Sequence, residues 1–451
     1  MSKSHTNTRP ADDIGDNLKI IPGLGLADLA GAGLPERLAG KVEGELEVFA
    51  DRMRHGLLAA AVAVGLEVFD ELLETEVTDI AGAKGRHNPD RTAVRHGSES
   101  AKVPMGGRLI DVAKPRVRGT DGSGEIGLET WAALADRDLL AEHTLVSMLA
   151  GVSTRNYASV LEPAGPDVAD ASSSTSRSAV SRRFVKATAK RLVEFRSRPL
   201  DDRRWSVVFI DGFGFGDETM VGAIGVDEAG NKLPLTVMHG TTENKTVVTR
   251  LLNNLTDRGL TADDGLLFVI DGGKALFHAV TDKFDGQALI QRCRFHKTKN
   301  VIDLLPGEHH AWVKRDLNRA WKLPDAGKAE QALRALAAKI GRTHPDAAAS
   351  LNEGLAETVT INRLGVDGTL ARTLATTNPM ESTVDIVRTH SRNVKRWMGG
   401  DMRLRWAAAG MLAAEHQYRR IKGCKQMPSF VTALYTATRP DDEPHLAAVA
   451  S

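Results

Sequence analysis

The sequence is short of cysteine, of long apolar runs and of net charge, and each shortage excludes something. Its two cysteines, Cys293 and Cys424, cannot supply a disulfide framework or a four-cysteine zinc site, and they fit a reducing compartment. The most apolar run, 57–66, is about half the length that crosses a bilayer. The polar start, 1–17, lacks the apolar stretch of a secretory signal. We therefore expect a cytoplasmic protein without a membrane partner.

The near-zero net charge conceals an uneven distribution. There are 59 Lys and Arg residues and 58 Asp and Glu residues, which gives a formal net charge of +1. Basic residues outnumber acidic ones by nine to three in 81–119, by ten to three in 176–204 and by ten to two in 388–425. Segments with this excess are typical of salt-sensitive phosphate binding. Near-neutrality therefore does not exclude a nucleic-acid partner, and these three segments are the expected contacts.

Patterning along the 451 residues divides the chain into several parts. Helical spacing of apolar residues dominates both halves, and a stretch of extended periodicity lies between them. The expected parts are a disordered tail (1–17), an N-terminal helical region with a basic linker (18–120), a helical DNA-binding region of helix-turn-helix type (121–204), the first part of an α/β core (205–293), a helical insertion (294–375), the last core helices (376–425) and a C-terminal tail (426–451).

The segment 176–204 begins with serine and continues as a helix with basic residues on one side. This is the pattern of the recognition element in a helix-turn-helix module. We expect DNA contacts from four of its side chains, Arg177, Arg182, Arg183 and Lys186. The alternative is a solvated helix face with no ligand.

From residue 205 the apolar period changes from helical to extended. Short runs rich in β-branched residues predict three antiparallel strands, at 205–210, 220–226 and 233–238. Helices and strands then alternate: a helix at 243–259, a strand at 266–270, a helix at 274–284 and a strand at 288–293. This order predicts a compact α/β layer.

Two aspartates stand where predicted strands end. Asp211 ends the first strand and Asp271 follows the fourth, and each precedes glycine. Catalytic groups of open α/β sheets gather at such strand ends, although either residue alone could be a turn-forming Asp. Two neighbouring carboxylates repel each other unless a cation lies between them, and oxygen ligands suit Mg²⁺ or Mn²⁺. We therefore expect a divalent-metal site here.

A third acid is expected from a helix that faces the same sheet edge. Glu381 is the best candidate, and Asp385 is its rival as a ligand. Three basic residues fall at +7, +11 and +14 from Glu381 on the same helical face: Arg388, Arg392 and Lys395. Such a face could lead a phosphate backbone past a metal. An ordinary surface helix with ion pairs is the alternative.

Four spaced motifs occur in one order: IDGF (210–213), ENK…LTDRGL (243–260), VIDGGKAL…QRCRFHKTKNVIDLLP (269–306) and TTNPMESTV (376–384). Together they resemble the Mutator-type family of bacterial insertion-sequence transposases, strongly over 205–425 and less sharply before it. The resemblance implies a ribonuclease-H-like catalytic core interrupted by an all-helical insertion. It also implies a metal-dependent DDE triad, which falls on Asp211, Asp271 and Glu381.

The C-x₂-H pair Cys293 and His296 has a spacing that can ligate zinc, but two ligands do not make a site. Members of the family that the sequence resembles carry the same pair. We therefore expect a packing or hydrogen-bonding role, either structural or next to the active centre; metal binding is the alternative.

An enzyme of this family would bind the terminal inverted repeats of its element in the bacterial nucleoid, as a homodimer or larger homo-oligomer. It would cut and join DNA with two Mg²⁺ or Mn²⁺ ions, which stabilise the attacking and leaving oxygens at phosphorus. No covalent intermediate is needed, and the three tyrosines offer no compelling nucleophile. A metal-dependent nuclease or resolvase on the same core is the main alternative. A domesticated DNA-binding protein without catalysis is the other.

Overall fold

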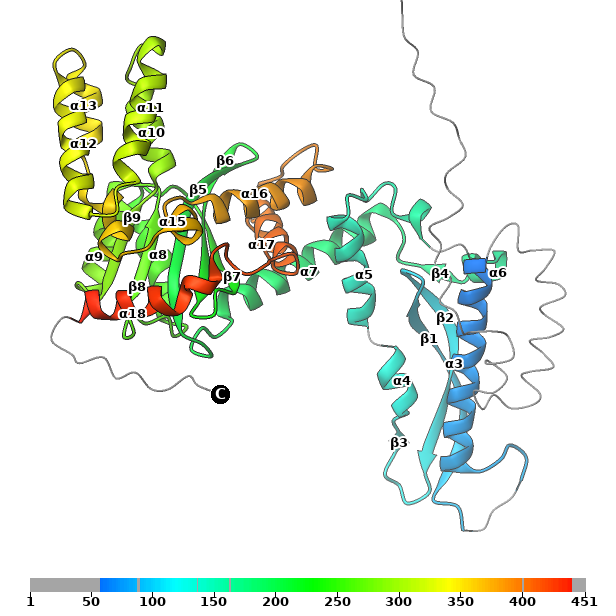
Figure 1. Cartoon of the computed structure of the whole chain (residues 1–451). Coiled ribbons are helices and arrows are strands. Elements are labelled where there is room, and N and C mark those ends of the chain that lie inside the picture. Colours follow the sequence, from blue (N-terminus) through cyan, green and yellow to red (C-terminus); the bar gives the residue numbers. More distant parts are fainter. Residues whose placement is uncertain (1–56, 87–89, 136, 162–163, 400, 440–451) are drawn as a thin grey trace, which may run out of the picture. The chain divides into compact units, whose positions relative to one another are not determined.

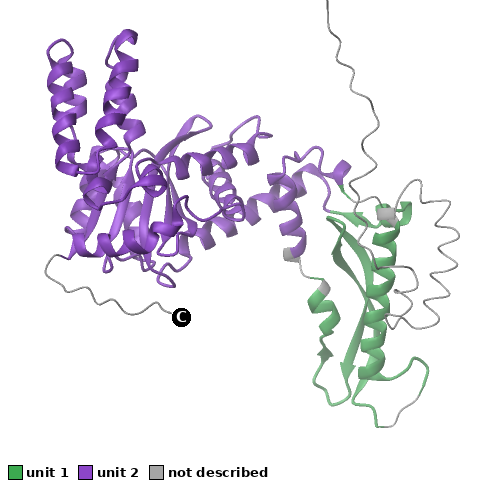
Figure 2. Cartoon of the chain, in the orientation of Figure 1, with its two compact units in different colours: residues 1–135, 161–173 green, residues 136–160, 174–451 purple. Residues whose placement is uncertain are grey.

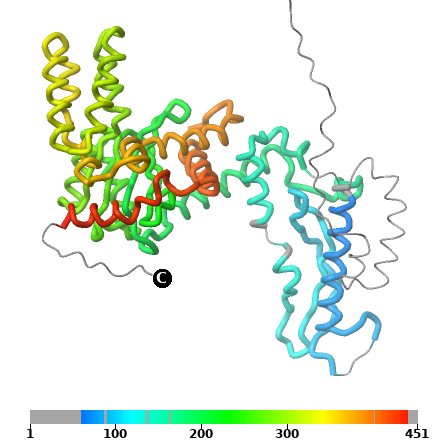
Figure 3. Tube along the Cα trace, in the orientation of Figure 1, coloured from blue at the N-terminus to red at the C-terminus, as the bar shows by residue number. Residues whose placement is uncertain are grey.

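The computed structural model describes residues 57–86, 90–135, 137–161, 164–399 and 401–439, which form two compact units (Figures 1 and 2). Unit 1 contains residues 1–135 and 161–173, and unit 2 contains 136–160 and 174–451. The chain therefore returns to unit 1 once, as its trace shows (Figure 3). The predicted boundary between 120 and 121 is wrong, because the two units share the region 121–204. The predicted tail 1–17 lies outside the described residues.

A long β-hairpin packed on one helix forms the core of unit 1. The helix α3 (Leu57–Ala81) buries Phe69, Leu73 and Val77 against the hairpin. The hairpin strands are β1 (Ala93–Met105) and β2 (Arg108–Gly119), and Gly106 and Gly107, which join them, both have positive φ. A two-residue turn of this kind favours glycine at both positions. The smaller elements are β3 (Glu125–Ile126), α4 (Glu129–Leu134), α6 (Pro166–Asp170) and β4 (Ser172–Ser173).

The predicted basic linker is wrong over 93–119, because this stretch is the hairpin itself. Val103, Ile110 and Val117 point into the core of unit 1, and charged residues occupy the opposite face of the strands. Four of the basic residues pair with acids at 2.8–3.0 Å: Arg95 with Glu74, Lys102 with Asp111, Lys114 with Glu99, and Arg116 with Glu125. The positive charge available to a partner is therefore smaller than the sequence suggests.

A five-stranded sheet lies at the centre of unit 2, in the order β7-β6-β5-β8-β9. Its strands are β5 (Trp205–Phe215), β6 (Glu218–Asp227), β7 (Lys232–His239), β8 (Leu266–Ile270) and β9 (Ala288–Arg292). The first three are antiparallel, whereas β8 runs parallel to both β5 and β9. The helices α8 (Lys245–Thr256) and α9 (Lys274–Phe284) share one apolar core with the sheet. The sequence predicts the order and type of these elements, although β5 extends beyond its predicted end.

Helices and turns occupy 294–375, as predicted, and they have an apolar core of their own. The helices are α10 (Arg294–Ile302), α11 (Gly307–Trp321), α12 (Ala326–Gly341), α13 (Pro345–Asn352), α14 (Thr360–Arg363) and α15 (Gly368–Leu374). Buried polar side chains join this region to the end of the sheet. The Gln291 side chain donates to the carbonyl of Thr358 at 3.1 Å, and Lys297 donates to the carbonyls of Ser350 and Glu353 at 2.6 Å.

The chain ends in α16 (Asn378–Ser391), α17 (Met402–Glu415) and α18 (Met427–Thr438). The predicted C-terminal tail is wrong over 427–438, because α18 buries Met427, Phe430 and Leu434 along one face. Residues 440–451 lie outside the described residues. Three 3₁₀ turns complete the list of elements: Ala158–Val160, Ala356–Val359 and Cys424–Gln426. Among the helices of the described ranges, none has both the length and the apolar character that crossing a bilayer requires.

The predicted helix-turn-helix geometry is also wrong. The helices α5 (Arg137–Leu149) and α7 (Arg177–Ser197) contact each other in unit 2, but the chain between them is far longer than the three- or four-residue turn of that motif. Arg183 does not face solvent freely: its Nε donates to Thr144 Oγ1 at 2.6 Å and its guanidinium donates to the Ser174 carbonyl at 3.0 Å. Burial lowers the pKa of Arg183. The other predicted DNA contacts of α7 are exposed: Arg177, Arg182 and Lys186.

Candidate active site

The parallel pairing of β5 with β8 brings two aspartates to the same level of the sheet. This pairing ends with Ile210 opposite Ile270, so the next residue of each chain segment is Asp211 or Asp271. The prediction that the first strand ends at Asp211 is wrong, because β5 continues to Phe215 as a hairpin with β6. Asp211 therefore marks the end of the parallel pairing and not the end of the strand.

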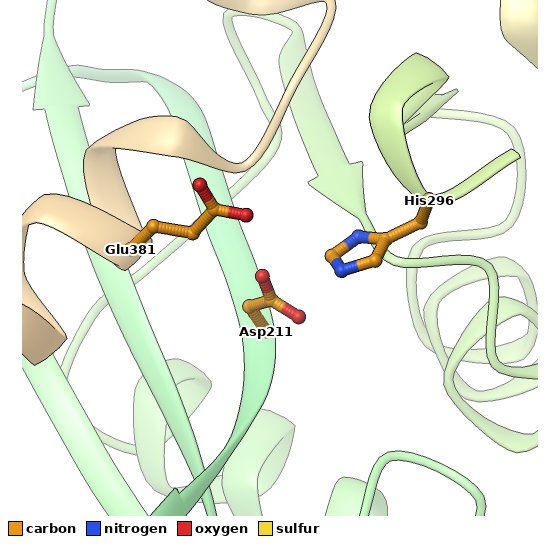
Figure 4. A group of neighbouring side chains, drawn as sticks. All are labelled: Asp211, His296 and Glu381. Atoms are coloured by element: carbon orange, nitrogen blue, oxygen red, sulfur yellow. The ribbon is translucent and has the colours of Figure 1, made fainter. Parts of the chain in front are cut away.

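The first turn of α16 places Glu381 beside Asp211. Ligand atoms of Asp211, Glu381 and His296 all lie within 4.8 Å of one another, and the three side chains point toward a common centre (Figure 4). They come from β5, α16 and α10. Asp385, the rival acid on α16, is exposed and lies 3.6 Å from the guanidinium of Arg388. Of the two acids on this helix, Glu381 is the one that faces Asp211.

Gly222 on β6 lies opposite Asp211 and leaves room for the start of α16. A Cβ atom at this position would overlap Cε of Met380, the buried residue before Glu381. We expect Gly222→Ala to lower the free energy of unfolding by about 1–3 kcal/mol, because overpacking forces side chains or backbone to shift. Urea unfolding measures this change. Gly214→Ala on β5 is the control, since no described atom lies within 4 Å of the Cβ it would add. Equal losses of unfolding free energy in both variants would contradict the close packing of Gly222 against Met380.

The carboxylate of Asp211 is only 5% exposed. Burial raises its pKa to about 6, against the opposing effects of the His296 charge and a hydrogen bond from Thr377. The charge of Asp271 also raises it, which places the two aspartates within electrostatic reach of each other. An ionised carboxylate in this position is costly unless a positive charge lies next to it. Asp211 therefore has the character of a cation ligand.

Asp271 is oriented by two hydrogen bonds of its own. Its Oδ2 accepts from Thr242 Oγ1 at 2.8 Å, and its Oδ1 accepts from the backbone N–H of Gly273 at 2.9 Å. Thr242 is buried and lies just before α8. Sequence reasoning missed Thr242, and its place directly before the ENK motif is the one signal that could have found it.

Cys293 and His296 lie at the start of α10. His296 belongs to the cluster with Asp211 and Glu381, and Cys293 lies next to it. The Cys293 thiol is fully buried and accepts from the backbone N–H of Thr377 at 3.4 Å and from its hydroxyl at 3.6 Å. A hydrogen bond with Cys293 raises the pKa of His296 to about 9; burial opposes this, and the charges of Asp211 and Asp271 add to it. Burial alone would raise the pKa of Cys293, but His296 outweighs it and the net direction is downward. Thr377 thus joins Cys293 to Asp211.

The basic residues that follow Glu381 do not all share one helical face. The helix α16 ends at Ser391, so Arg392 is its C-cap and Lys395 lies beyond it. The predicted position of Lys395 on that face is therefore wrong, because the helix ends about one turn before the pattern does. Arg388 is exposed and donates to the Gly214 carbonyl at 3.3 Å. Arg392 and Lys395 are also exposed.

A buried arginine fixes the turn between β5 and β6. Arg403 of α17 is 5% exposed; it pairs with Asp217, and its guanidinium lies 3.0 Å from the Glu218 carboxylate. The ring of Trp397 packs on Phe215 with 4.9 Å between ring centroids. Part of the positive charge in 388–425 therefore serves the packing of unit 2.

Comparison with known proteins identifies the class of this chain as insertion-sequence transposases. The profile of the Mutator family of transposases matches residues 50–417. The chain belongs to this family.

Three relatives are transposases of named insertion sequences. The chain is 28% identical to that of ISRM5 from Rhizobium meliloti, over 66% of this chain and 73% of the relative. It is 30% identical to that of IS6120 from Mycolicibacterium smegmatis, over 38% of this chain and 52% of the relative. It is 28% identical to that of IS1081 from Mycobacterium tuberculosis, over 60% of this chain and 63% of the relative. In the last two the match spans less than two thirds of the relative.

Proposed function

We propose that this chain binds the terminal inverted repeats of an insertion sequence, and cuts and joins DNA there through Asp211, Asp271 and Glu381. The observation that carries the proposal is the convergence of Asp211 and Glu381 at the end of the β5–β8 pairing, in a chain of the Mutator family. Displacement at phosphorus requires groups that hold divalent ions next to the reacting oxygens. Carboxylates from two strands and a helix are suited to this task.

We also infer that the sheet of unit 2 is a ribonuclease-H-like core. Three antiparallel strands followed by two parallel ones, in the order β7-β6-β5-β8-β9, support this inference. The helices of 294–375 would then be an insertion between β9 and α16, with a core of their own.

The residues present fit a divalent cation of the Mg²⁺ or Mn²⁺ type. Asp211 carries a buried carboxylate whose ionisation is disfavoured, and its ligand atom lies within 4.8 Å of those of Glu381 and His296. Asp211, Asp271 and Glu381 would hold two ions. Bound ions would stabilise the attacking and leaving oxygens at phosphorus.

The chain's own residues orient these ligands. Thr242 and the N–H of Gly273 fix the Asp271 carboxylate, and Thr377 fixes Asp211. Exposed basic side chains would bind the phosphates of the DNA backbone through salt-sensitive contacts: Arg177, Arg182, Lys186, Arg388, Arg392 and Lys395. Joining the two ends of one element implies a homodimer or larger homo-oligomer.

A strand-joining assay tests the proposed function. The full chain, Mg²⁺, a labelled duplex carrying one element end and a plasmid target should give plasmid that bears the label covalently. A duplex with a scrambled end is the control and should give no labelled plasmid. Hydrolysis of the end without joining would indicate a nuclease or resolvase instead. Binding without either product would indicate a non-catalytic DNA-binding protein.

A further inference from the structure

The third member of the cluster at Asp211 is an imidazole, not a carboxylate. We propose that His296 is a direct ligand of the divalent cation held by Asp211 and Glu381, and that its nitrogen shifts the preference of the site from Mg²⁺ toward Mn²⁺. This inference rests on the proposed function, because it concerns the same cation.

The geometry of the cluster is close to what a shared cation needs. Ligand bonds to such cations measure about 2.0–2.2 Å, so two ligands on opposite sides of one ion lie about 4.0–4.4 Å apart. The ligand atoms of Asp211, His296 and Glu381 lie within 4.8 Å of one another, and the imidazole ring faces the two carboxylates (Figure 4). A movement of a few tenths of an ångström would bring them onto one ion.

The imidazole also has a nitrogen available. Nδ1 of His296 is buried and has no hydrogen-bond partner among the described residues. A buried polar atom left in this way costs about 1–3 kcal/mol, which a bound cation would offset. An unpartnered nitrogen beside two carboxylates is therefore a candidate third donor for the shared cation.

Neighbouring residues hold the ring in place. The Cys293 thiol interacts with His296 and is itself fixed by the N–H and hydroxyl of Thr377. Metal-binding histidines are commonly oriented by such outer contacts. The C-x₂-H spacing then has a physical reason, because Cys293 precedes α10 and His296 lies in its first turn, where the side chain faces Asp211.

The nature of the donor predicts metal preference. Mg²⁺ takes oxygen ligands in strict octahedral geometry, whereas nitrogen donors favour transition-metal ions. A site with two carboxylates and one imidazole therefore binds Mn²⁺ better than Mg²⁺. The probe is Mn²⁺ alone, added to the full chain without DNA.

Pulsed electron paramagnetic resonance of the Mn²⁺-loaded chain tests for the nitrogen directly. We expect ¹⁴N modulation in the wild-type spectrum, replaced by the ¹⁵N pattern when the protein is made with ¹⁵N-histidine. His296→Ala should abolish the modulation, and His278→Ala, on the exposed face of α9, should retain it. Even if His296→Ala does not fold, the labelled wild-type protein shows whether a histidine is a ligand, and His296 is the histidine whose ligand atom lies within 4.8 Å of those of Asp211 and Glu381.

Calorimetric titration separates a ligand from a structural residue. His296→Ala should weaken Mn²⁺ binding at least about tenfold, and Mg²⁺ binding less than about threefold. Equal losses for the two ions would overturn the proposal. A wild-type Mn²⁺ spectrum without nitrogen modulation would overturn it too, and would leave the proposed transposase function intact. A wild-type chain that binds no Mn²⁺ would overturn both.

Discussion

Asp271→Ala should abolish cation-dependent cleavage of an element-end duplex while leaving DNA binding nearly unchanged. Asp271 follows β8 directly beside Asp211, and its carboxylate is held ready by Thr242 and Gly273. Removing one group that stabilises charge in a transition state commonly costs about 10²–10³ in rate, and a missing metal ligand should cost at least the upper figure. We therefore expect a rate at least about a thousandfold lower.

Single-turnover cleavage of a labelled duplex measures this rate, and a gel-shift titration measures binding. Asp282→Ala, an exposed acid on α9, is the matched control and should cleave at the wild-type rate. Cleavage retained in Asp271→Ala would remove this residue from the catalytic centre. Loss of binding together with cleavage would indicate a structural defect instead.

Asp211→Asn should make the cation-free protein more stable at pH 7.5. Burial raises the pKa of Asp211 from 3.8 to about 6, so the folded chain holds this proton more tightly than the unfolded chain does. The resulting stability is fully present below about pH 4 and is lost as the pH rises through 6. At pH 7.5 the ionised carboxylate therefore costs up to about 3 kcal/mol, which asparagine removes.

Urea unfolding in the presence of a chelator measures this difference. We expect the free energy of unfolding of Asp211→Asn to exceed that of the wild type by about 1–3 kcal/mol at pH 7.5 and to equal it near pH 4. Added Mg²⁺ should reduce this difference in the free energy of unfolding, because the ion stabilises the wild type, which binds it, and not the variant. The control is Asp282→Asn, which removes an exposed charge. A variant less stable than the wild type at pH 7.5 would show that the charge of Asp211 is already compensated.

The sequence predicts the sheet of unit 2 well because its strands are buried on both faces. The strand segments 205–210 and 266–270 are buried throughout and almost entirely apolar, and a helix with a clear apolar face lies between them in the sequence. The hairpin of unit 1 has one charged face, and its many Lys, Arg and Glu residues conceal the alternation. The pair Gly106 and Gly107 indicates a two-residue turn, but the many charged residues around it favour a linker instead.

The same contrast holds for the candidate site. Asp211 and Asp271 stand out in the sequence because each follows an apolar run, and Glu381 stands out because it lies near the start of a predicted helix. The sequence predicts a structural role for His296 or a place next to the active centre, but not its position in one cluster with Asp211 and Glu381, because only the folded chain brings α10 next to β5. The charge count of 176–204 also fails for Arg183, whose side chain donates hydrogen bonds to Thr144 and to the Ser174 carbonyl. A count of charges in the sequence cannot distinguish a basic side chain that stabilises the packing of the protein from one that is free to bind phosphate.

The strand β4 has a consequence for how such elements evolve. It belongs to unit 1 and pairs with β2, although residues 136–160 of unit 2 precede it in the chain. One recombination event near residue 135 would carry α3 and the hairpin into another gene and leave β4 behind. A complete exchange of unit 1 needs junctions at three places, near 135, 161 and 173. Unit 1 should therefore be inherited together with unit 2 and seldom exchanged between insertion sequences.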